Sequence, residues 1–231
     1  MKLILMPGMD GTGLFFRPLL DALPREASTQ VLAYPGFELN SYSTLLPLIR
    51  RALPTSEKYI LVAESYSGPL ALMIGAECPV GMCGIVLSAS FVQSPAWWAP
   101  KSMRHLVVGP AFTLFPAFTR AKALLGGYSS PALRALSREV YRLVSASVLA
   151  ARVRETLAVD VVSELRACQV PILYIRGTND NVVPERCLRV IQRERPDVQT
   201  VSFPAPHMVL QARPNESVQA ICRFAAEAGA V

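Results

Sequence analysis

Residues 59–74 contain the stretch that decides the fold: Tyr59-Ile60-Leu61-Val62-Ala63-Glu64-Ser65-Tyr66-Ser67-Gly68, followed by Pro69-Leu70-Ala71-Leu72-Met73-Ile74. The apolar run before Ser65 predicts a buried strand, and the run after it predicts a helix. A serine at such a sharp turn has its hydroxyl pushed out of the backbone and set beside the positive end of the helix, which is how a nucleophile is presented. Such a serine can also be a plain helix N-cap, so the stretch alone leaves both interpretations open.

A nucleophilic serine needs an imidazole as general base. The chain contains two histidines, His105 and His207. His207 lies in the loop after an expected last strand at 198–203. His105 has no strand end next to it, so we expect it to be a surface or lid-packing residue. His207 is therefore the candidate base.

The base needs a carboxylate to orient it, and Asp180 is the candidate. It follows the apolar run 171–176, at the carboxyl end of an expected strand, where open parallel sheets bind their ligands. Its Asn-Asp-Asn setting is also good turn chemistry, so a structural role is the alternative. Ser65, Asp180 and His207 each follow an expected strand, and their order along the chain is that of one particular fold.

The alternation of strands and helices predicts an α/β fold, with a mostly parallel central sheet of about six strands flanked by helices. The expected strands are near residues 2–6, 30–34, 59–63, 83–88, 171–176 and 198–203. Residues 1–6 run straight into a glycine loop without a cleavage site, so we expect a first strand there and no leader. The whole chain, 1–231, is expected to be one domain.

The segment 92–165 interrupts this alternation and predicts a helical lid inserted after the fourth strand. It has no clear strand, and its part from Ser137 to Val162 is strongly helical in pattern. A lid over an apolar site is lined by aromatic side chains, although packing of the lid against the core is the alternative role for each of them. The candidate pocket residues are Trp97, Trp98, Phe112, Phe115 and Phe118.

With these residues in view, the chain resembles α/β-hydrolases over nearly all its length, from Met6-Pro7-Gly8 to His207. Its opening, Leu5-Met6-Pro7-Gly8-Met9-Asp10-Gly11-Thr12-Gly13, is similar to a branch of esterase-like and acyltransferase-like members that begin L-P-G-x-D-G-T-G. Two departures are visible. Ala63 and Ser67 replace the glycines of the strict G-x-S-x-G pattern, and Pro7 stands where the common form has histidine.

The resemblance implies an oxyanion hole made of two backbone N–H groups, those of Met9 and Tyr66. Their side chains are then expected to wall the site and to contribute shape. Gly8, Gly11 and Gly13 have neither the dinucleotide nor the P-loop spacing, so a phosphate-binding loop is not indicated.

The composition fits an enzyme with an apolar site. Hydrophobic residues make up 52% of the chain, with a mean hydropathy of +0.33, and no stretch reaches the roughly 20 apolar residues that span a bilayer. The five cysteines have no C-x-x-C spacing and no histidine nearby, so neither a disulfide framework nor a metal site is expected. A cytoplasmic location is the default expectation.

The net charge of +6 comes mainly from scattered arginines, without the aromatic-interleaved basic run typical of nucleic-acid binding. A solvated helix face is the expected role of these arginines, and an affinity for anionic substrates or for a membrane surface is the alternative. Among them are Arg120, Arg134, Arg138, Arg142, Arg152 and Arg154.

The function predicted from these features is hydrolysis of an ester or thioester with an apolar acyl group, through an acyl-enzyme on Ser65, without metal or organic cofactor. An acyltransferase that uses the same triad with an alcohol acceptor is one alternative. A non-catalytic protein that binds a small molecule on the same scaffold is another, and a membrane-associated interaction protein is a third. The natural substrate and the oligomeric state are left open by the sequence.

Overall fold

A computed structural model of the chain describes residues 1–38, 40–96, 98–100, 102, 107 and 124–230. In this part of the chain, six strands form one sheet in the order β2-β1-β3-β4-β5-β6, and every neighbouring pair is parallel. The strands are β1 (Lys2–Met6), β2 (Ser28–Val31), β3 (Tyr59–Glu64), β4 (Met82–Ser88), β5 (Ile172–Gly177) and β6 (Gln199–Phe203). The predicted fold class is confirmed.

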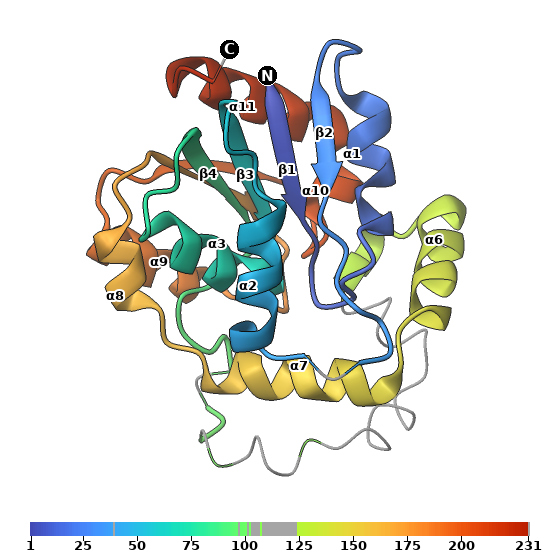
Figure 1. The fold of residues 1–231 in the computed structure, drawn as a ribbon. Helices are drawn as coiled ribbons and strands as arrows, with labels where there is room; N and C mark the ends of the chain where they lie inside the picture. The colour runs from blue at the N-terminus through green and yellow to red at the C-terminus, as the bar shows by residue number, and fades with distance from the viewer. Residues whose placement is uncertain (39, 97, 101, 103–106, 108–123, 231) are drawn as a thin grey trace.

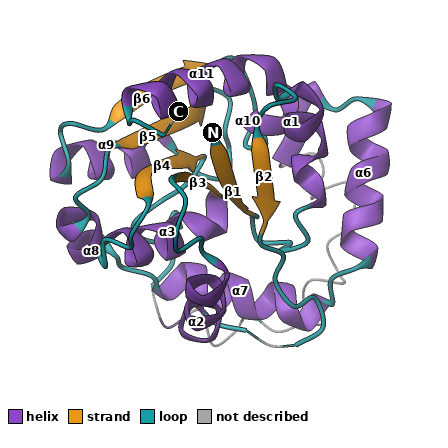
Figure 2. Cartoon of the chain, turned by 45° about the horizontal axis from the view of Figure 1, so that its top comes forward, coloured by secondary structure: helices purple, strands orange, loops and turns teal. Residues whose placement is uncertain are grey.

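Helices cover both faces of the sheet, as Figures 1 and 2 show. One layer contains α1 (Arg17–Ala22), α10 (Val209–Ala212) and α11 (Pro214–Glu227), which pack on one another. The other layer contains α2 (Tyr42–Ala52), α3 (Gly68–Gly75), α8 (Val162–Ala167) and α9 (Glu185–Glu194). Two hydrophobic cores lie between the sheet and these layers, and alternate residues of one strand enter different cores: Leu61 of β3 joins the first, and Ile60 and Val62 join the second.

The central strands end side by side, and this register places the loops that follow them. Met6 of β1 is opposite Ala63 of β3, and Glu64 is opposite Ser88 of β4. The loop after β1 therefore lies beside the turn after β3. All six residues of β3 are buried, as expected for a parallel strand covered on both faces.

In the described part of the insertion between β4 and β5, two long helices, α6 (Pro131–Arg142) and α7 (Ala146–Ala158), precede α8. The helical stretch predicted from Ser137 to Val162 is interrupted, because Ser145 accepts a hydrogen bond from the Val148 N–H at 3.3 Å and begins a new helix. Figure 1 shows α7 lying across the end of the molecule toward which the strands point. Six residues singled out in this insertion lie outside the described residues: Trp97, His105, Phe112, Phe115, Phe118 and Arg120.

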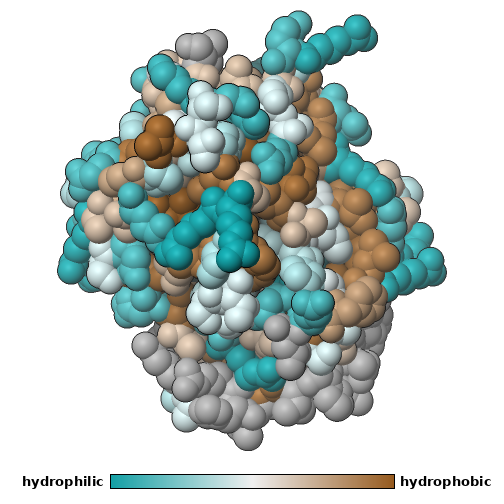
Figure 3. Space-filling model, viewed as in Figure 1, coloured by the Kyte–Doolittle hydropathy of each residue, from teal (hydrophilic) through white to brown (hydrophobic). Residues whose placement is uncertain are grey.

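Figure 3 shows hydrophilic residues spread over one face of the molecule with apolar residues between them. Within the described residues, no helix combines the length and the apolar character that crossing a bilayer requires.

Candidate active site

The turn after β3 holds Ser65 in an unusual backbone conformation. Ser65 is the first residue of a short 3-10 turn, Ser65–Ser67, and its φ of 49° lies in the left-handed region. A residue with a side chain is strained there, so the surrounding contacts must hold it. The Ser90 hydroxyl does so by donating to the Ser65 carbonyl at 2.7 Å. A Cβ on Gly68 would lie 1.8 Å from the same hydroxyl, which explains why a glycine begins α3.

Three side chains predicted from separate parts of the sequence meet at this turn. His207 Nε2 lies 3.0 Å from Ser65 Oγ, and His207 Nδ1 lies 2.8 Å from Asp180 Oδ2. The histidine and aspartate side chains are 6% and 2% exposed. With Nδ1 carrying the proton toward Asp180, the Nε2 lone pair of the neutral ring faces the serine hydroxyl, which is the arrangement a general base requires.

Backbone contacts fix Asp180 and His207 relative to each other. Asp180 Oδ1 accepts hydrogen bonds from the Val182 and Val183 N–H groups at 2.7 and 2.9 Å, which leaves Oδ2 for the histidine. The Asn179 N–H donates to the Ala205 carbonyl at 2.9 Å, so the loop that carries Asp180 is joined to the loop that carries His207. The two loops therefore form one unit.

The electrostatic surroundings of His207 favour its charged form. Burial acts to lower the pKa of His207, but the negative charge of Asp180, its hydrogen bond and the charge of Glu64 outweigh burial and raise it above the usual value. These surroundings therefore stabilise the imidazolium form of His207 relative to the neutral ring.

The loop after β1 is joined to the turn after β3 by Ser67. The Ser67 hydroxyl donates to the Pro7 carbonyl and accepts a hydrogen bond from the Tyr34 hydroxyl at 2.6 Å. A glycine at this position, as in the strict pattern, has no hydroxyl to make these bonds. In this chain, the departure from the pattern thus connects the two loops.

Gly8 and Met9 of the loop line a cavity together with Ser65. Among the described residues, the Met9 N–H has no hydrogen-bond partner. The expectation that both Met9 and Tyr66 wall the site with their side chains is wrong for Tyr66. The Tyr66 ring is buried, stacked on Tyr42 with ring centres 4.6 Å apart, and does not line the cavity.

The cavity over Ser65 has a volume of about 240 Å³. Its walls are largely apolar, from the loop after β1, the insertion and the loops around Asp180 and His207: Phe15, Leu124, Tyr141, Leu149, Val182 and Met208. Trp98, the one described residue of the five predicted for the pocket, is 68% exposed and is not part of the lining. Among the described residues, the aromatic side chains that line the cavity are therefore Phe15 and Tyr141, and the sequence analysis predicted neither of them.

Two buried carboxyl groups also face the cavity, and the sequence had not marked them as functional. Glu64 precedes the serine and accepts a hydrogen bond from Gln211 Nε2 at 2.8 Å. Burial raises the pKa of Glu64 to about 7, and the negative charge of Asp10 also raises it. The hydrogen bond from Gln211 and the charge of His207 lower this pKa, but by less. Burial also raises the pKa of Asp10, against two hydrogen bonds from Thr12. In the sequence, the only signal for Glu64 is its place between the apolar run 59–63 and Ser65.

One of the arginines expected on a solvated helix face is buried. Arg152 of α7 has no exposed surface, and its guanidinium donates to backbone carbonyls of the loop after β1. A charged residue type on a helix predicts solvent exposure, but here the neighbouring loops supply acceptors that replace water. The expectation is wrong for this residue.

Comparison with known proteins identifies the family. A model of the alpha/beta hydrolase family matches residues 3–220, and the chain belongs to this family. No curated protein matches the sequence significantly. Among the described residues, no three His, Cys, Asp or Glu side chains are grouped so that they could hold a metal ion.

Several solved structures share the fold. A thermophilic esterase from Thermogutta terrifontis superposes with a TM-score of 0.82 at 19% identity, covering 99% of this chain and 90% of that chain. An enol-lactonase from Burkholderia xenovorans gives 0.80 at 16% identity over 97% of this chain and 91% of that one. A bromoperoxidase from Bacillus anthracis gives 0.82 at 15% identity over 97% and 91%. At these low identities, the similarity of the structures shows the fold alone. Membership of the family and the esterases among the similar structures together support a hydrolase.

Proposed function

We propose that this chain is a serine hydrolase of the carboxylesterase or thioesterase type, acting on esters or thioesters with an apolar acyl group. The observation that carries the proposal is the hydrogen-bonded line from Ser65 Oγ through His207 to Asp180, which opens into a cavity with apolar walls. The three groups occupy the roles of nucleophile, base and orienting acid.

In the proposed reaction, His207 Nε2 takes the Ser65 proton as Oγ attacks the acyl carbon. The carbonyl oxygen becomes an anion, and the backbone N–H groups of Met9 and Tyr66 are the proposed donors that stabilise it. His207 then gives the proton to the leaving alcohol or thiol, and the acyl group stays on Ser65. A water molecule, deprotonated by the same histidine, releases the acid and restores the serine. No step requires a metal or organic cofactor.

The substrate class follows from the lining of the cavity. Each methylene group of a substrate that is buried against apolar side chains such as Phe15, Leu124 and Leu149 adds about 0.8 kcal/mol to the free energy of binding. An acyl or aryl group is therefore favoured over a sugar or a peptide. A cytoplasmic location belongs to the same proposal, supported by the five free thiols.

The test is a series of p-nitrophenyl esters of increasing acyl length, on the wild type and on Ser65→Ala. We expect kcat/KM to rise by up to about fourfold per methylene and then to level off when the cavity is full. Ser65→Ala should lower turnover by several orders of magnitude while the protein stays folded. Ser43→Ala, at an exposed serine, is the matched control and should retain full activity.

Labelling with a fluorophosphonate separates an enzyme from a binding protein on the same scaffold. An activated serine reacts with this probe, so the wild type should be labelled and Ser65→Ala should not. Near wild-type esterase activity of Ser65→Ala would rule out the assignment of the nucleophile. Activity that is highest on acetate and falls steadily with chain length would rule out the apolar acyl group. Added alcohols that capture the acyl group faster than water would identify an acyltransferase.

A further inference from the structure

The guanidinium of Arg152 is completely buried, yet its hydrogen bonds are made to neutral groups. Nη1 donates to the Met9 and Asp10 carbonyls at 2.8 and 2.7 Å, and Nη2 donates to the Pro35 carbonyl at 2.9 Å. Nε donates to Asn40 Oδ1 at 3.0 Å. Removing a guanidinium from water is costly unless its N–H groups find partners, and here four bonds supply them.

Two of the residues that Arg152 binds, Met9 and Asp10, lie in a tight turn. The Gly11 N–H donates to the Gly8 carbonyl at 3.0 Å, which makes Met9 and Asp10 the central residues of a four-residue turn. Arg152 binds the carbonyls of both central residues. Because a peptide unit is planar, the bond to the Gly8 carbonyl sets the direction of the Met9 N–H in the same unit, and Arg152 fixes the two units that follow.

Gly11 is fitted to this arrangement. Its φ of 73° lies in the left-handed region, and a Cβ there would lie 2.4 Å from Arg152 Nη1. A side chain at this position would therefore push the guanidinium away. Gly11 and Arg152 together allow the turn and α7 to approach closely.

We infer that Arg152, on α7 of the insertion, is a positioning residue that holds the turn Gly8–Gly11 so that the Met9 N–H stays directed at the acyl oxygen. The inference rests on the proposed function, since it concerns the anion that forms during acyl transfer. Arg152 does not line the cavity and has no hydrogen bond to Ser65, so it acts through the backbone that it holds. The positive charge of Arg152 lies next to the turn and also stabilises the negative charge that forms on the acyl oxygen, as fixed dipoles and charges do in oxyanion holes.

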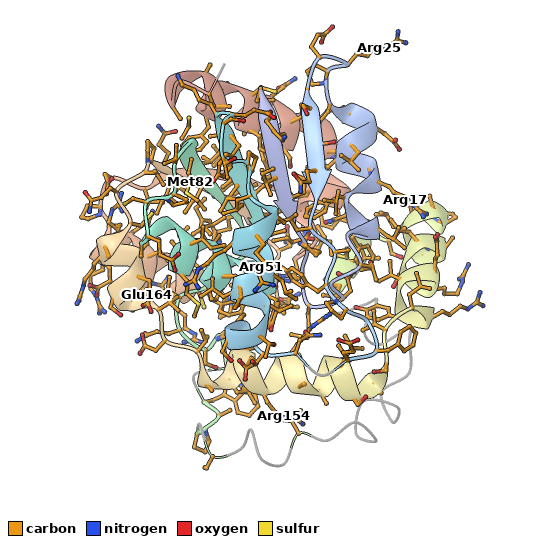
Figure 4. The ribbon with its side chains drawn as sticks, viewed as in Figure 1. Arg17, Arg25, Arg51, Met82, Arg154 and Glu164 are labelled. Atoms are coloured by element: carbon orange, nitrogen blue, oxygen red, sulfur yellow. The ribbon has the colours of Figure 1, made fainter. Side chains whose placement is uncertain are left out.

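The experiment compares Arg152→Met, which keeps much of the volume but no donor, with Arg152→Lys and the wild type. Arg154→Met is the matched control, because Arg154 is on the same helix, lies on its side away from the sheet (Figure 4), and donates to the Val107 carbonyl. Active sites are counted by fluorophosphonate titration, so that kcat is expressed per functional site. A trifluoromethyl ketone with the chain length of the best ester serves as a probe, since its adduct on the serine carries the same oxyanion.

We expect Arg152→Met to lower kcat per site about 10-fold to 100-fold, because misplacing a catalytic group by about 1 Å has effects of this size. The affinity for the trifluoromethyl ketone should fall by a similar factor, while KM and the pH midpoint of kcat/KM change little. Arg152→Lys should lie between, since an ammonium group keeps the charge but cannot reach all four acceptors. Arg154→Met should behave as the wild type.

A purely structural Arg152 gives a different result: a lower melting temperature and fewer active sites, but unchanged kcat per site and unchanged ketone affinity. That result would overturn the inference. If Arg152→Met does not fold, Arg152→Lys and Gly11→Ala are compared by kcat per site and by ketone affinity. Gly11→Ala is informative because the added Cβ displaces the guanidinium of Arg152. A wild type that neither reacts with the fluorophosphonate nor cleaves any ester refutes the proposed function itself, and the inference is refuted with it.

Discussion

Glu64→Gln should make the protein more stable at alkaline pH than the wild type. Glu64 is 5% exposed, is the last residue of the wholly buried strand β3 and directly precedes Ser65. Glutamine has nearly the same shape, and its amide oxygen can still accept the hydrogen bond from Gln211 Nε2. The substitution thus removes the ionisable group and leaves the packing in place.

The magnitude follows from the pKa. Burial raises the pKa of Glu64 from 4.5 to about 7 in the folded protein, and each pKa unit corresponds to about 1.4 kcal/mol. The folded state then binds this proton more tightly than the unfolded state. The stabilisation is fully present below the unfolded pKa and is lost as the pH rises through the folded pKa. Between about pH 4.5 and pH 8 the wild type should lose about 3 kcal/mol of unfolding free energy that Glu64→Gln keeps.

The assay is urea unfolding at several pH values, followed by circular dichroism. Asp10 and His207 titrate in both proteins, so the difference between wild type and variant isolates Glu64. Glu38→Gln, which removes a carboxylate from an exposed residue, is the control and should change stability by less than about 0.5 kcal/mol throughout. A difference between Glu64→Gln and the wild type that does not grow with pH would refute the reasoning.

Two further predictions concern the base and the turn. The kcat/KM of the wild type should rise with pH through one titration, with its midpoint above 6.5 because the pKa of His207 is raised, and Glu64→Gln should move this midpoint to lower pH in a pH–rate profile. An unshifted midpoint in the variant would contradict the coupling between the two groups. Gly68→Ala should cost about 1 to 3 kcal/mol in thermal unfolding and also lower kcat, because the new Cβ meets the Ser90 hydroxyl that holds the Ser65 carbonyl. Full activity of that variant would show that the turn tolerates the displacement.

The sheet could be predicted from the sequence because buried parallel strands are nearly continuous apolar runs. The central strands β3 and β5 were placed within a residue of their bounds. β2 was expected at 30–34 and is found at Ser28–Val31. It is an edge strand with exposed and half-buried residues, so its polar start does not give the apolar signal on which the prediction relied.

The candidate site could be predicted only where chain order and residue chemistry suffice. Ser65, Asp180 and His207 each follow a strand, and parallel strands bring their carboxyl ends to one edge of the sheet. The wall of the cavity could not be predicted in this way, because it depends on how the insertion folds over that edge. Trp98 was chosen for its residue type, yet Leu149 of α7 reaches the cavity and Trp98 does not.

Three contacts around the turn Gly8–Gly11 explain why the site is well defined although the G-x-S-x-G pattern around Ser65 is imperfect. Ser67 replaces a glycine of the strict pattern but binds the Pro7 carbonyl. Tyr34 supports Ser67, and Arg152 binds the next carbonyls from α7. Each contact joins segments far apart in the sequence, so no window of residues can reveal it. Because α7 carries both Arg152 and Leu149 of the cavity wall, a displacement of α7 changes the cavity and the proposed oxyanion donor together. Substitutions that shift α7 should therefore alter chain-length preference and kcat in parallel, whereas substitutions confined to the cavity wall should alter the preference alone.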